Sequence, residues 1–292
     1  HVWVSPDSVV YKNGILLNDT TSVPSQNNYY QYRHLLKLVF NNKRVRLDDR
    51  KKYMLVTDNW SNGHYHWVCE VLPKLISIKH VAKEFVLLLP DKPYINTIGR
   101  ESLELLGIHF NEIVLMKEKE VYKVPGLFYI PQMTKKGLHD ETMTSIRDSF
   151  MIRDLQADKK IYISRAGTTH RKVKNESSLL PLLKDRGFAI YDGEAMSLKD
   201  QLALFSTCNT LMGIHGAGLA NCIFMKKGAR LVELRKKESN NSNTGYWHLA
   251  DSLGLGYYYF NGIPDSENPL IGNGCNLEIP VADFEKKILN LV

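Results

Sequence analysis

Two stretches of this chain alternate between strand-like and helix-like patterns, and this alternation limits the fold more than any other feature. In the first stretch, apolar runs at 53–58, 85–90 and 113–116 are separated by helical patterns over 66–82 and 95–106. Such alternation is typical of parallel sheets whose strands are joined by crossover helices. We therefore expect an α/β fold.

The alternation restarts after a polar segment near residues 134–158, which carries one helical pattern on Met143, Ile146, Phe150 and Ile152. Strands are then expected at 161–164, 188–191, 210–214, 229–234 and 257–260. Helices are expected at 176–185, 198–205 and 246–252, with a short one after Gly216. This second stretch has the pattern of a Rossmann-type unit of its own.

The chain length of 292 residues agrees with two compact lobes. We predict an N-terminal lobe over 1–157 and a C-terminal lobe over 158–292. Residues 1–42 suggest an appended β-hairpin and surface loop, with a turn at Lys12-Asn13-Gly14. The apolar spacing of 281–292 predicts a final amphipathic helix, a candidate to pack on the first lobe.

Composition places the chain among globular proteins with anionic partners. Hydrophobic residues make up 43% and charged residues 24%, which is ordinary for a folded domain. A net charge of +7 favours a sugar-nucleotide diphosphate, nucleic acid or an anionic membrane leaflet as partner. Basic residues are scattered in short groups and no nucleic-acid motif occurs, so no nucleic-acid partner is expected.

Several absences narrow the class of protein further. No apolar run is long enough to cross a bilayer, so we expect a cytoplasmic protein, with peripheral association at the inner membrane face as an alternative. The four cysteines are far apart and indicate buried thiols instead of disulfides. The sequence does not indicate an oligomeric state.

The most informative motif is the glycine-rich segment from Gly213 through His215, Gly216, Ala217 and Gly218, between a predicted strand and a predicted helix. Glycine lets a phosphate or ribose approach the main chain closely, and a helix start offers free N–H groups to an anion. A tight structural turn is the competing explanation. The spacing differs from that of dinucleotide-binding motifs.

Two arginines follow the first predicted strand of the second lobe. Arg165 stands at the strand end, and Arg171 and Asn175 lie in the loop before the next helix. Open α/β sheets bind ligands at such strand ends, and a guanidinium can hold a diphosphate through two parallel bonds. A solvated basic loop is the alternative.

A second constellation lies at 58–70, where a predicted strand runs into a helix. His66 and Glu70 are four residues apart, so they share a helix face and suit a general base for an acceptor hydroxyl. Metal ligation by His64, His66 and Glu70, or a structural role for this aromatic helix start, are the alternatives. No Asp-x-Asp triplet occurs, and we predict a site without metal and without cofactor.

These motifs together resemble glycosyltransferase family 61, whose bacterial members include capsular polysaccharide biosynthesis proteins. The similar segments are 66–75 (HWVCEVLPKL), 162–165 (YISR) with Arg171 and Asn175, and 213–219 (GIHGAGL) continuing to 231–234 (LVEL). The sequence departs from the family pattern at Gly63, where asparagine is common, and at Lys74, where arginine is common. The first departure leaves open whether Asn62 or His64 takes that role.

The resemblance implies an inverting transferase of the two-lobed GT-B type, with an interlobe cleft, a nucleotide-sugar donor in the second lobe and a carbohydrate or glycoconjugate acceptor towards the first. Eukaryotic members use donors linked to uridine diphosphate. By position, the donor site would contain Arg165, Arg171, Asn175, His215, Gly216, Ala217, Gly218 and Glu233. The acceptor side would contain Asn62, His64 and Trp67, with His66 or Glu70 as the catalytic base.

We therefore expect an inverting, metal-independent glycosyltransferase of surface polysaccharide or glycan synthesis. A non-catalytic protein that binds a nucleotide sugar or polysaccharide on the same fold remains the alternative, because a fold alone does not determine function.

Overall fold

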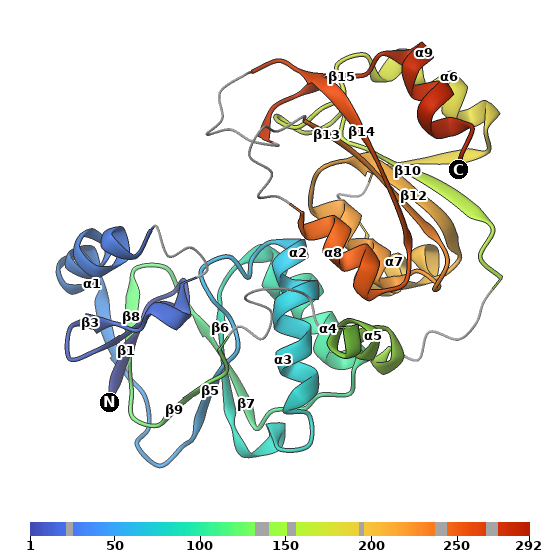
Figure 1. Cartoon of the computed structure of the whole chain (residues 1–292). Helices are drawn as coiled ribbons and strands as arrows, with labels where there is room; N and C mark the ends of the chain where they lie inside the picture. The colour runs from blue at the N-terminus through green and yellow to red at the C-terminus, as the bar shows by residue number, and fades with distance from the viewer. Residues whose placement is uncertain (22–25, 132–139, 151–155, 193–195, 237–243, 267–273) are drawn as a thin grey trace. The chain divides into compact units, whose positions relative to one another are not determined.

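The computed structural model describes residues 1–21, 26–131, 140–150, 156–192, 196–236, 244–266 and 274–292. The chain divides into two compact units, His1–Lys135 and Lys136–Val292 (Figure 1). This division comes earlier than the boundary expected at residue 157. The boundary lies earlier because helix α5 (Asp140–Ser149) belongs to the second unit. It packs there against η8 (Ala217–Phe224) and α8 (Gly245–Ser252).

The first unit contains a parallel sheet in the order β7-β6-β5-β9. Its strands are β5 (Tyr53–Leu55), β6 (Val86–Pro90), β7 (Glu112–Met116) and β9 (Leu127–Tyr129). Strand β6 is buried along its whole length, as expected for a parallel strand covered on both faces. The crossover segments are α2 (His64–His66), η4 (Trp67–Val71), α3 (Leu72–Ser77), η5 (Ala82–Glu84), η6 (Ile95–Gly99) and α4 (Arg100–Leu105). The alternation predicted from residue 52 is confirmed.

A second sheet of the first unit has the order β3-β2-β1-β8-β4. Its strands are β1 (Val2–Val4), β2 (Val10–Lys12), β3 (Ile15–Leu16), β4 (Lys43–Arg46) and β8 (Glu120–Val124). The predicted hairpin turn is confirmed, because Asn13 and Gly14 both have positive φ, 51° and 77°. The hairpin belongs to a larger sheet, since β1 pairs with β8 more than a hundred residues later.

The expectation of a surface loop before residue 42 was wrong. The chain forms a short turn, η1 (Asn18–Thr20), and then a helix made of η3 (Tyr29–His34) and α1 (Leu35–Asn41). We call this helix 29–41. Its buried side chains His34 and Leu38 are four residues apart and face the second sheet, where Leu38 joins Tyr11 in a small core. Tertiary burial of this one face stabilises a helix that contains β-branched and aromatic residues.

The second unit contains one sheet in the order β11-β10-β12-β13-β14-β15. The strands are β10 (Lys159–Ser164), β11 (Phe188–Asp192), β12 (Cys208–Ile214), β13 (Arg230–Lys236), β14 (Gly256–Pro264) and β15 (Leu277–Glu278). The first five are parallel, and β15 is antiparallel at the edge. Every strand predicted in this half is therefore present.

The helices of the second unit agree closely with the sequence pattern. Helix α6 (Glu176–Asp185) and helix α7 (Leu198–Phe205) have the predicted bounds. The Ser197 hydroxyl caps α7 by accepting from the Asp200 N–H at 3.1 Å. The closing helix, α9 (Val281–Phe284) with η10 (Glu285–Leu289), packs into the core of its own unit.

The strand order creates a switch point between β10 and β12. The chain leaves β10 through α6 to form β11 on one side, and returns through α7 to form β12 on the other side. In open α/β sheets, ligands bind outside the carboxyl ends of the strands at such a point. Arg165 follows directly after β10, and the segment that begins at His215 follows directly after β12.

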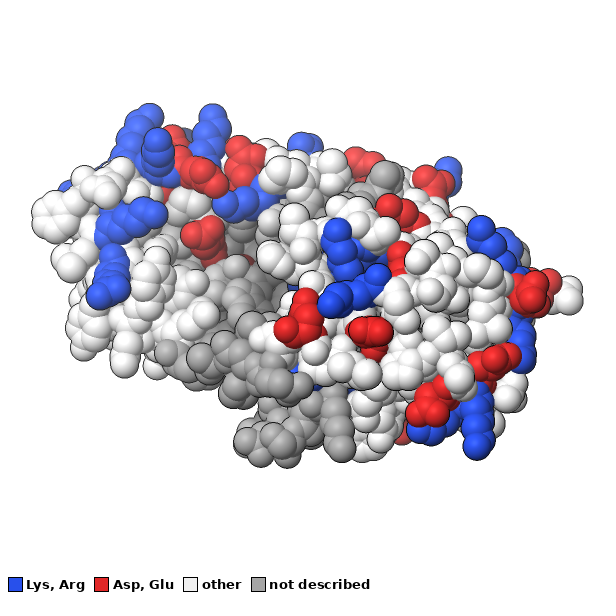
Figure 2. All heavy atoms as spheres, turned by 90° about the horizontal axis from the view of Figure 1, so that it is seen from above, with Lys and Arg blue, Asp and Glu red and all other residues white. Residues whose placement is uncertain are grey.

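Charged side chains are interspersed on the surface. The face seen in Figure 2 has Lys and Arg in small groups beside Asp and Glu, which agrees with the scattered basic residues of the sequence. In the part of the chain that the structure describes, no helix combines the length and apolar character needed to cross a bilayer. All four cysteines are buried free thiols, as predicted.

Candidate active site

Arg165 and Gly216 lie against each other at the switch point of the second unit. A Cβ at Gly216 would stand 3.1 Å from Arg165 Nη1. Gly216 has an extended φ of 170°, so glycine is needed here for space and not for backbone freedom. The absence of a side chain lets the guanidinium lie against the main chain that leaves β12.

His215 forms a buried pair with Glu233 of β13. His215 Nδ1 bonds to Glu233 Oε1, and the Glu233 side chain is only 1% exposed. An ionised carboxylate can only accept, so Nδ1 carries the hydrogen and the tautomer of His215 is determined by Glu233. The structure thus brings together two residues predicted for the donor site, with Glu233 beneath the imidazole.

Two further side chains surround Glu233. The Tyr257 hydroxyl donates to Glu233 Oε2, and Arg235 Nη1 lies 3.9 Å from the same oxygen. Burial, followed by the charge of Glu233, raises the pKa of Tyr257 well above its usual value, so the phenol stays protonated as a donor. Glu233 therefore has hydrogen-bonding or cationic partners on both oxygens.

The loop after His215 is held by Tyr246 of α8. The Tyr246 hydroxyl donates to the Gly216 carbonyl at 2.6 Å, and its ring meets the His215 ring edge-on at 5.4 Å. Ala217 and Gly218 follow as the half-buried start of η8. A Cβ at Gly218 would approach Ile163 to 3.2 Å, so this glycine also lets the chain pass close to β10.

Glu176, at the start of α6, holds the end of β10 in place through hydrogen bonds. It is buried and accepts from the Tyr162 and Ser164 hydroxyls, each at 2.9 Å. Ser164 in turn accepts from the Ala166 N–H at 3.2 Å. Burial raises the pKa of Tyr162, with Glu176 adding to the shift. These bonds position the turn that carries Arg165.

Arg171 and Asn175 lie further along the same loop. Arg171 is half-buried with a left-handed φ of 58°. Asn175 is used by the fold, because its amide donates to the Ile279 carbonyl at 2.7 Å and accepts from the Ile279 N–H at 2.9 Å. The structure therefore gives Asn175 a tethering role for the segment after β15.

In the first unit, His66 and Glu70 meet as their spacing predicts. His66 Nδ1 lies 2.9 Å from Glu70 Oε2, with the His66 side chain 23% exposed and that of Glu70 10% exposed. The Trp60 ring meets the imidazole edge-on at 5.0 Å. The arrangement is an imidazole oriented by a carboxylate, in which the imidazole is the more accessible group.

Lys74 lies behind this pair and is fully buried. Its Nζ donates to the Val56 carbonyl at 3.1 Å and lies near the Tyr129 ring, 5.8 Å from its centroid. Burial lowers the pKa of Lys74, while the charges of Asp58 and Glu70 oppose this shift. Lys74 is thus a buried amine whose charged form is favoured by Asp58 and Glu70, at a position where the sequence departs from the family pattern.

The three acceptor-side candidates have different environments. Asn62 is exposed. His64 Nδ1 lies 2.8 Å from the Tyr94 hydroxyl. Trp67 has no exposed surface, and its indole N–H donates to Ser102 Oγ at 3.1 Å, which is the environment of a core residue.

Sequence reasoning missed Tyr246, Tyr257, Arg235 and the role of Lys74. A lysine inside the apolar run 67–75 was a visible signal for a buried cation, because such a charge needs nearby partners. The two tyrosines gave no local signal. They reach Gly216 and Glu233 only through the pairing of distant elements.

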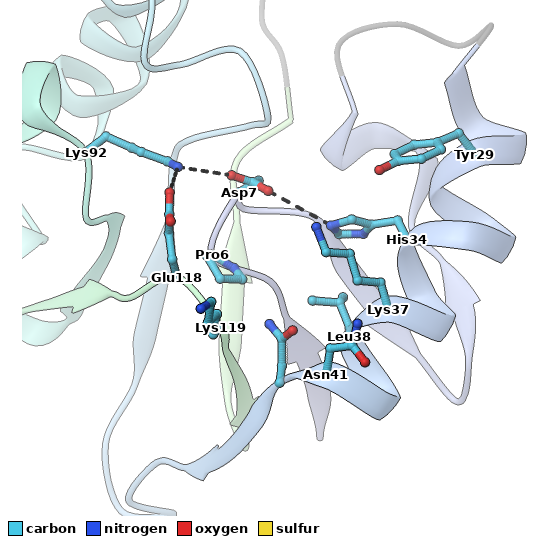
Figure 3. Close-up of a pocket in the computed structure, with 11 residues that line it drawn as sticks. Pro6, Asp7, Tyr29, His34, Lys37, Leu38, Asn41, Lys92, Glu118 and Lys119 are labelled. Atoms are coloured by element: carbon cyan, nitrogen blue, oxygen red, sulfur yellow. Dashed lines mark hydrogen bonds and ion pairs between the residues drawn. The ribbon is translucent and has the colours of Figure 1, made fainter.

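The described residues also form a pocket of about 380 Å³ in the first unit, beside helix 29–41 (Figure 3). Lys92 lies in it, 2.8 Å from Glu118 and 3.8 Å from Asp7. None of the residues predicted for the donor or acceptor site lines this pocket.

No group of three or more His, Cys, Asp or Glu side chains suited to a metal ion occurs among the described residues. The His64, His66 and Glu70 set considered from the sequence does not form such a group.

Comparison with known proteins finds a family model and curated relatives that match this chain. The model of the family Glycosyltransferase 61 matches residues 64–232, more than half of the chain. An EGF domain-specific O-linked N-acetylglucosamine transferase of Drosophila melanogaster is 30% identical over 143 residues, 45% of this chain and 26% of that protein. An alpha-1,3-arabinosyltransferase of Oryza sativa subsp. japonica is 28% identical over 102 residues, 33% of this chain and 18% of that protein. The chain therefore matches only part of each relative.

The matched range contains both constellations described above, His66 with Glu70 and Arg165 with His215. The chain belongs to glycosyltransferase family 61.

Proposed function

We propose that this chain is an inverting, metal-independent glycosyltransferase that moves a sugar from a nucleotide diphosphate, of the uridine type, to a carbohydrate or glycoconjugate acceptor in polysaccharide or glycan synthesis. The observation that carries the proposal is the contact of Arg165 with Gly216 at the switch point of a parallel sheet. A cation beside the small residues of this turn, at the carboxyl ends of the strands, suits a diphosphate.

In this proposal the second unit binds the donor. The Arg165 guanidinium binds the diphosphate, and the main chain at Gly216, Ala217 and Gly218 approaches it closely because these residues carry little or no side chain. His215, with its tautomer determined by Glu233, donates or accepts at the nucleotide or sugar. Arg171 is a second cation for the leaving group, whose negative charge grows as the glycosidic bond breaks.

The first unit supplies the base. His66 is more exposed than Glu70 and already bonds to it, so we assign the base to His66 and the orienting role to Glu70. His66 removes the proton of the acceptor hydroxyl through its second ring nitrogen. The hydroxyl oxygen then bonds to the anomeric carbon, the bond to the diphosphate breaks, and the configuration inverts.

The relatives suggest which donors to test. Their names refer to N-acetylglucosamine and arabinose. The uridine diphosphate forms of these two sugars make a first screen, read by thermal shift. A donor at about a hundred times its dissociation constant stabilises a folded protein by roughly 2.7 kcal/mol.

The proposal is tested with Arg165→Ala, assayed for transfer with the donor that this screen identifies. We expect kcat/KM to fall roughly 30-fold to 1,000-fold, which corresponds to a loss of about 2–4 kcal/mol of transition-state stabilisation.

Arg230→Ala is the matched control, because Arg230 begins β13 at the opposite end of the strands. Activity of Arg165→Ala within about threefold of the parent contradicts the role. Donor binding by the parent without any transfer favours the non-catalytic alternative.

A further inference from the structure

Helix 29–41 exposes large apolar side chains on its outer face. Tyr32, Leu36 and Phe40 are 64%, 57% and 78% exposed, and Tyr29 and Val39 are 48% and 44% exposed. Successive members of this set are one to four residues apart, so they form one continuous stripe along the helix. We call these five residues the apolar stripe.

The stripe is not the face that joins the helix to its own fold. That role belongs to His34 and Leu38 on the opposite side, with His34 Nδ1 2.7 Å from the Tyr11 hydroxyl. A surface helix normally presents polar residues outwards. Large apolar side chains gathered on an exposed face mark an interaction site.

Basic side chains border the stripe. Arg33 and Lys37 lie on the helix itself, and Lys43 and Arg44 follow it directly in β4. All four are exposed, and among the described residues none of them forms an ion pair. At the left of Figure 2, the end of the first unit that carries α1, Lys and Arg stand beside uncharged surface, with Asp and Glu among them towards the top of the view.

The nearby carboxylates do not cancel this positive charge. Asp7 and Glu118 line the pocket next to the helix, and Lys92 pairs with both (Figure 3). Lys37 and Lys119 line the same pocket, and neither lies within 4.0 Å of a carboxylate in the described part of the chain. The cations still outnumber the carboxylates, because Arg33, Lys37, Lys43, Arg44, Lys92 and Lys119 stand against Asp7, Glu118 and Glu120, which lies opposite Lys43 in the β4–β8 register.

We propose that helix 29–41 is a docking face for an anionic lipid surface. The apolar stripe enters the headgroup and acyl boundary, while Arg33, Lys37, Lys43 and Arg44 contact the phosphates. A lipid surface accepts a convex apolar helix bordered by cations without needing a shaped groove. The inference rests on the surface alone and does not depend on the glycosyl-transfer proposal.

The test is co-sedimentation of the full chain with vesicles of phosphatidylcholine, alone or with about 30% phosphatidylserine. We expect binding to the anionic vesicles, weak binding to the neutral ones, and weaker binding as salt rises. Leu36→Glu with Phe40→Glu should abolish sedimentation. Arg33→Glu with Lys37→Glu should weaken it by at least about 25-fold, since each basic residue near such a surface contributes about fivefold.

Matched controls separate docking from general effects. Ile263→Glu changes an apolar residue of the second unit that is 56% exposed, almost the same as Leu36. Lys184→Glu with Lys286→Glu reverses two exposed charges that form no ion pair among the described residues. Both controls should bind vesicles like the parent, and circular dichroism should show all variants folded.

Three results overturn the proposal. The first is equal sedimentation of the stripe variants and the parent, and the second is no binding of the parent to anionic vesicles. The third is a concentration-dependent dimer in analytical ultracentrifugation that Leu36→Glu with Phe40→Glu abolishes while vesicles stay unbound. In that third case the face joins two copies of this chain instead of meeting lipid.

Discussion

His66 and Glu70 form the dyad on which transfer depends in the proposed reaction. Their 2.9 Å contact orients the imidazole, so removal of the imidazole removes the proton acceptor. We predict that His66→Ala lowers kcat by about 10²-fold to 10⁴-fold, the usual contribution of a general base. Glu70→Gln should cause a smaller loss, because a neutral amide still accepts from Nδ1 but stabilises the imidazolium less.

Donor binding distinguishes this effect from unfolding. Thermal stabilisation by the nucleotide should be unchanged in both variants, since neither residue belongs to the donor site. His80→Ala changes an exposed histidine just beyond α3 and should retain full activity. A kcat for His66→Ala equal to that of the parent would assign the base elsewhere.

Gly216 determines where the Arg165 guanidinium lies. An added Cβ would stand 3.1 Å from Nη1, and the guanidinium is the flexible end of its side chain, so it would move while the fold stays. We predict that Gly216→Ala lowers kcat/KM by about tenfold to 100-fold through misplacement of the cation, with an almost unchanged melting temperature. Gly126→Ala is the control, because its Cβ would meet only the Lys51 carbonyl at 3.8 Å. Unchanged kcat/KM in Gly216→Ala would contradict the assigned geometry.

Strand β15 and the residues after it are tied to the loop before α6. The Asn175 amide makes two bonds to the backbone of Ile279, a fully buried residue. Loss of both leaves buried backbone groups unpaired, so Asn175→Ala should lower the free energy of unfolding by about 2 kcal/mol. Urea unfolding without nucleotide measures this change.

Asn175→Asp provides the comparison, because it keeps the acceptor for the Ile279 N–H and loses the donor to the Ile279 carbonyl. Its stability should lie between that of the parent and that of Asn175→Ala. A loss of donor affinity at unchanged stability would instead indicate direct contact of Asn175 with the donor.

Buried tyrosines make the stability of the entire chain depend on pH at the alkaline end. Burial raises the pKa of Tyr122 to about 12, and raises the pKa values of Tyr11, Tyr94 and Tyr129 further. The folded state therefore keeps these protons while the unfolded state releases them above its pKa of about 10. Their contribution to the free energy of unfolding is complete below about pH 10 and is lost as pH rises through the pKa values of the folded state.

We predict that the free energy of unfolding falls above about pH 10, by roughly 1.4 kcal/mol per pH unit for each such tyrosine. Lys74 acts in the opposite direction, because its lowered pKa leaves the unfolded state with more protons. Because Lys74 is one group and the buried tyrosines are several, the effect of the tyrosines is the larger one. Urea unfolding at a series of alkaline pH values measures the slope, and Tyr94→Phe should reduce it. A flat profile to about pH 11 would contradict the burial of these phenols.

Local patterns were enough to predict much of the fold and part of the site. The bounds of α6 and α7, the turn at Asn13 and Gly14, and the contact of His66 with Glu70 depend on residues close in the sequence. Helix 29–41 was missed because its outer face is apolar, which obscures the one-sided spacing of a surface helix.

The amino-acid sequence by itself determined the alternating α/β architecture, the order of the strands along the chain and the placement of Arg165 and His215 at strand ends. Only the tertiary structure decided that β1 pairs with β8, that Tyr257 bonds to Glu233 and that Asn175 holds Ile279. Propensity, spacing and turn chemistry act over a few residues. Partners far apart in sequence are selected by the packing and hydrogen-bond satisfaction of the complete fold, which no local pattern records.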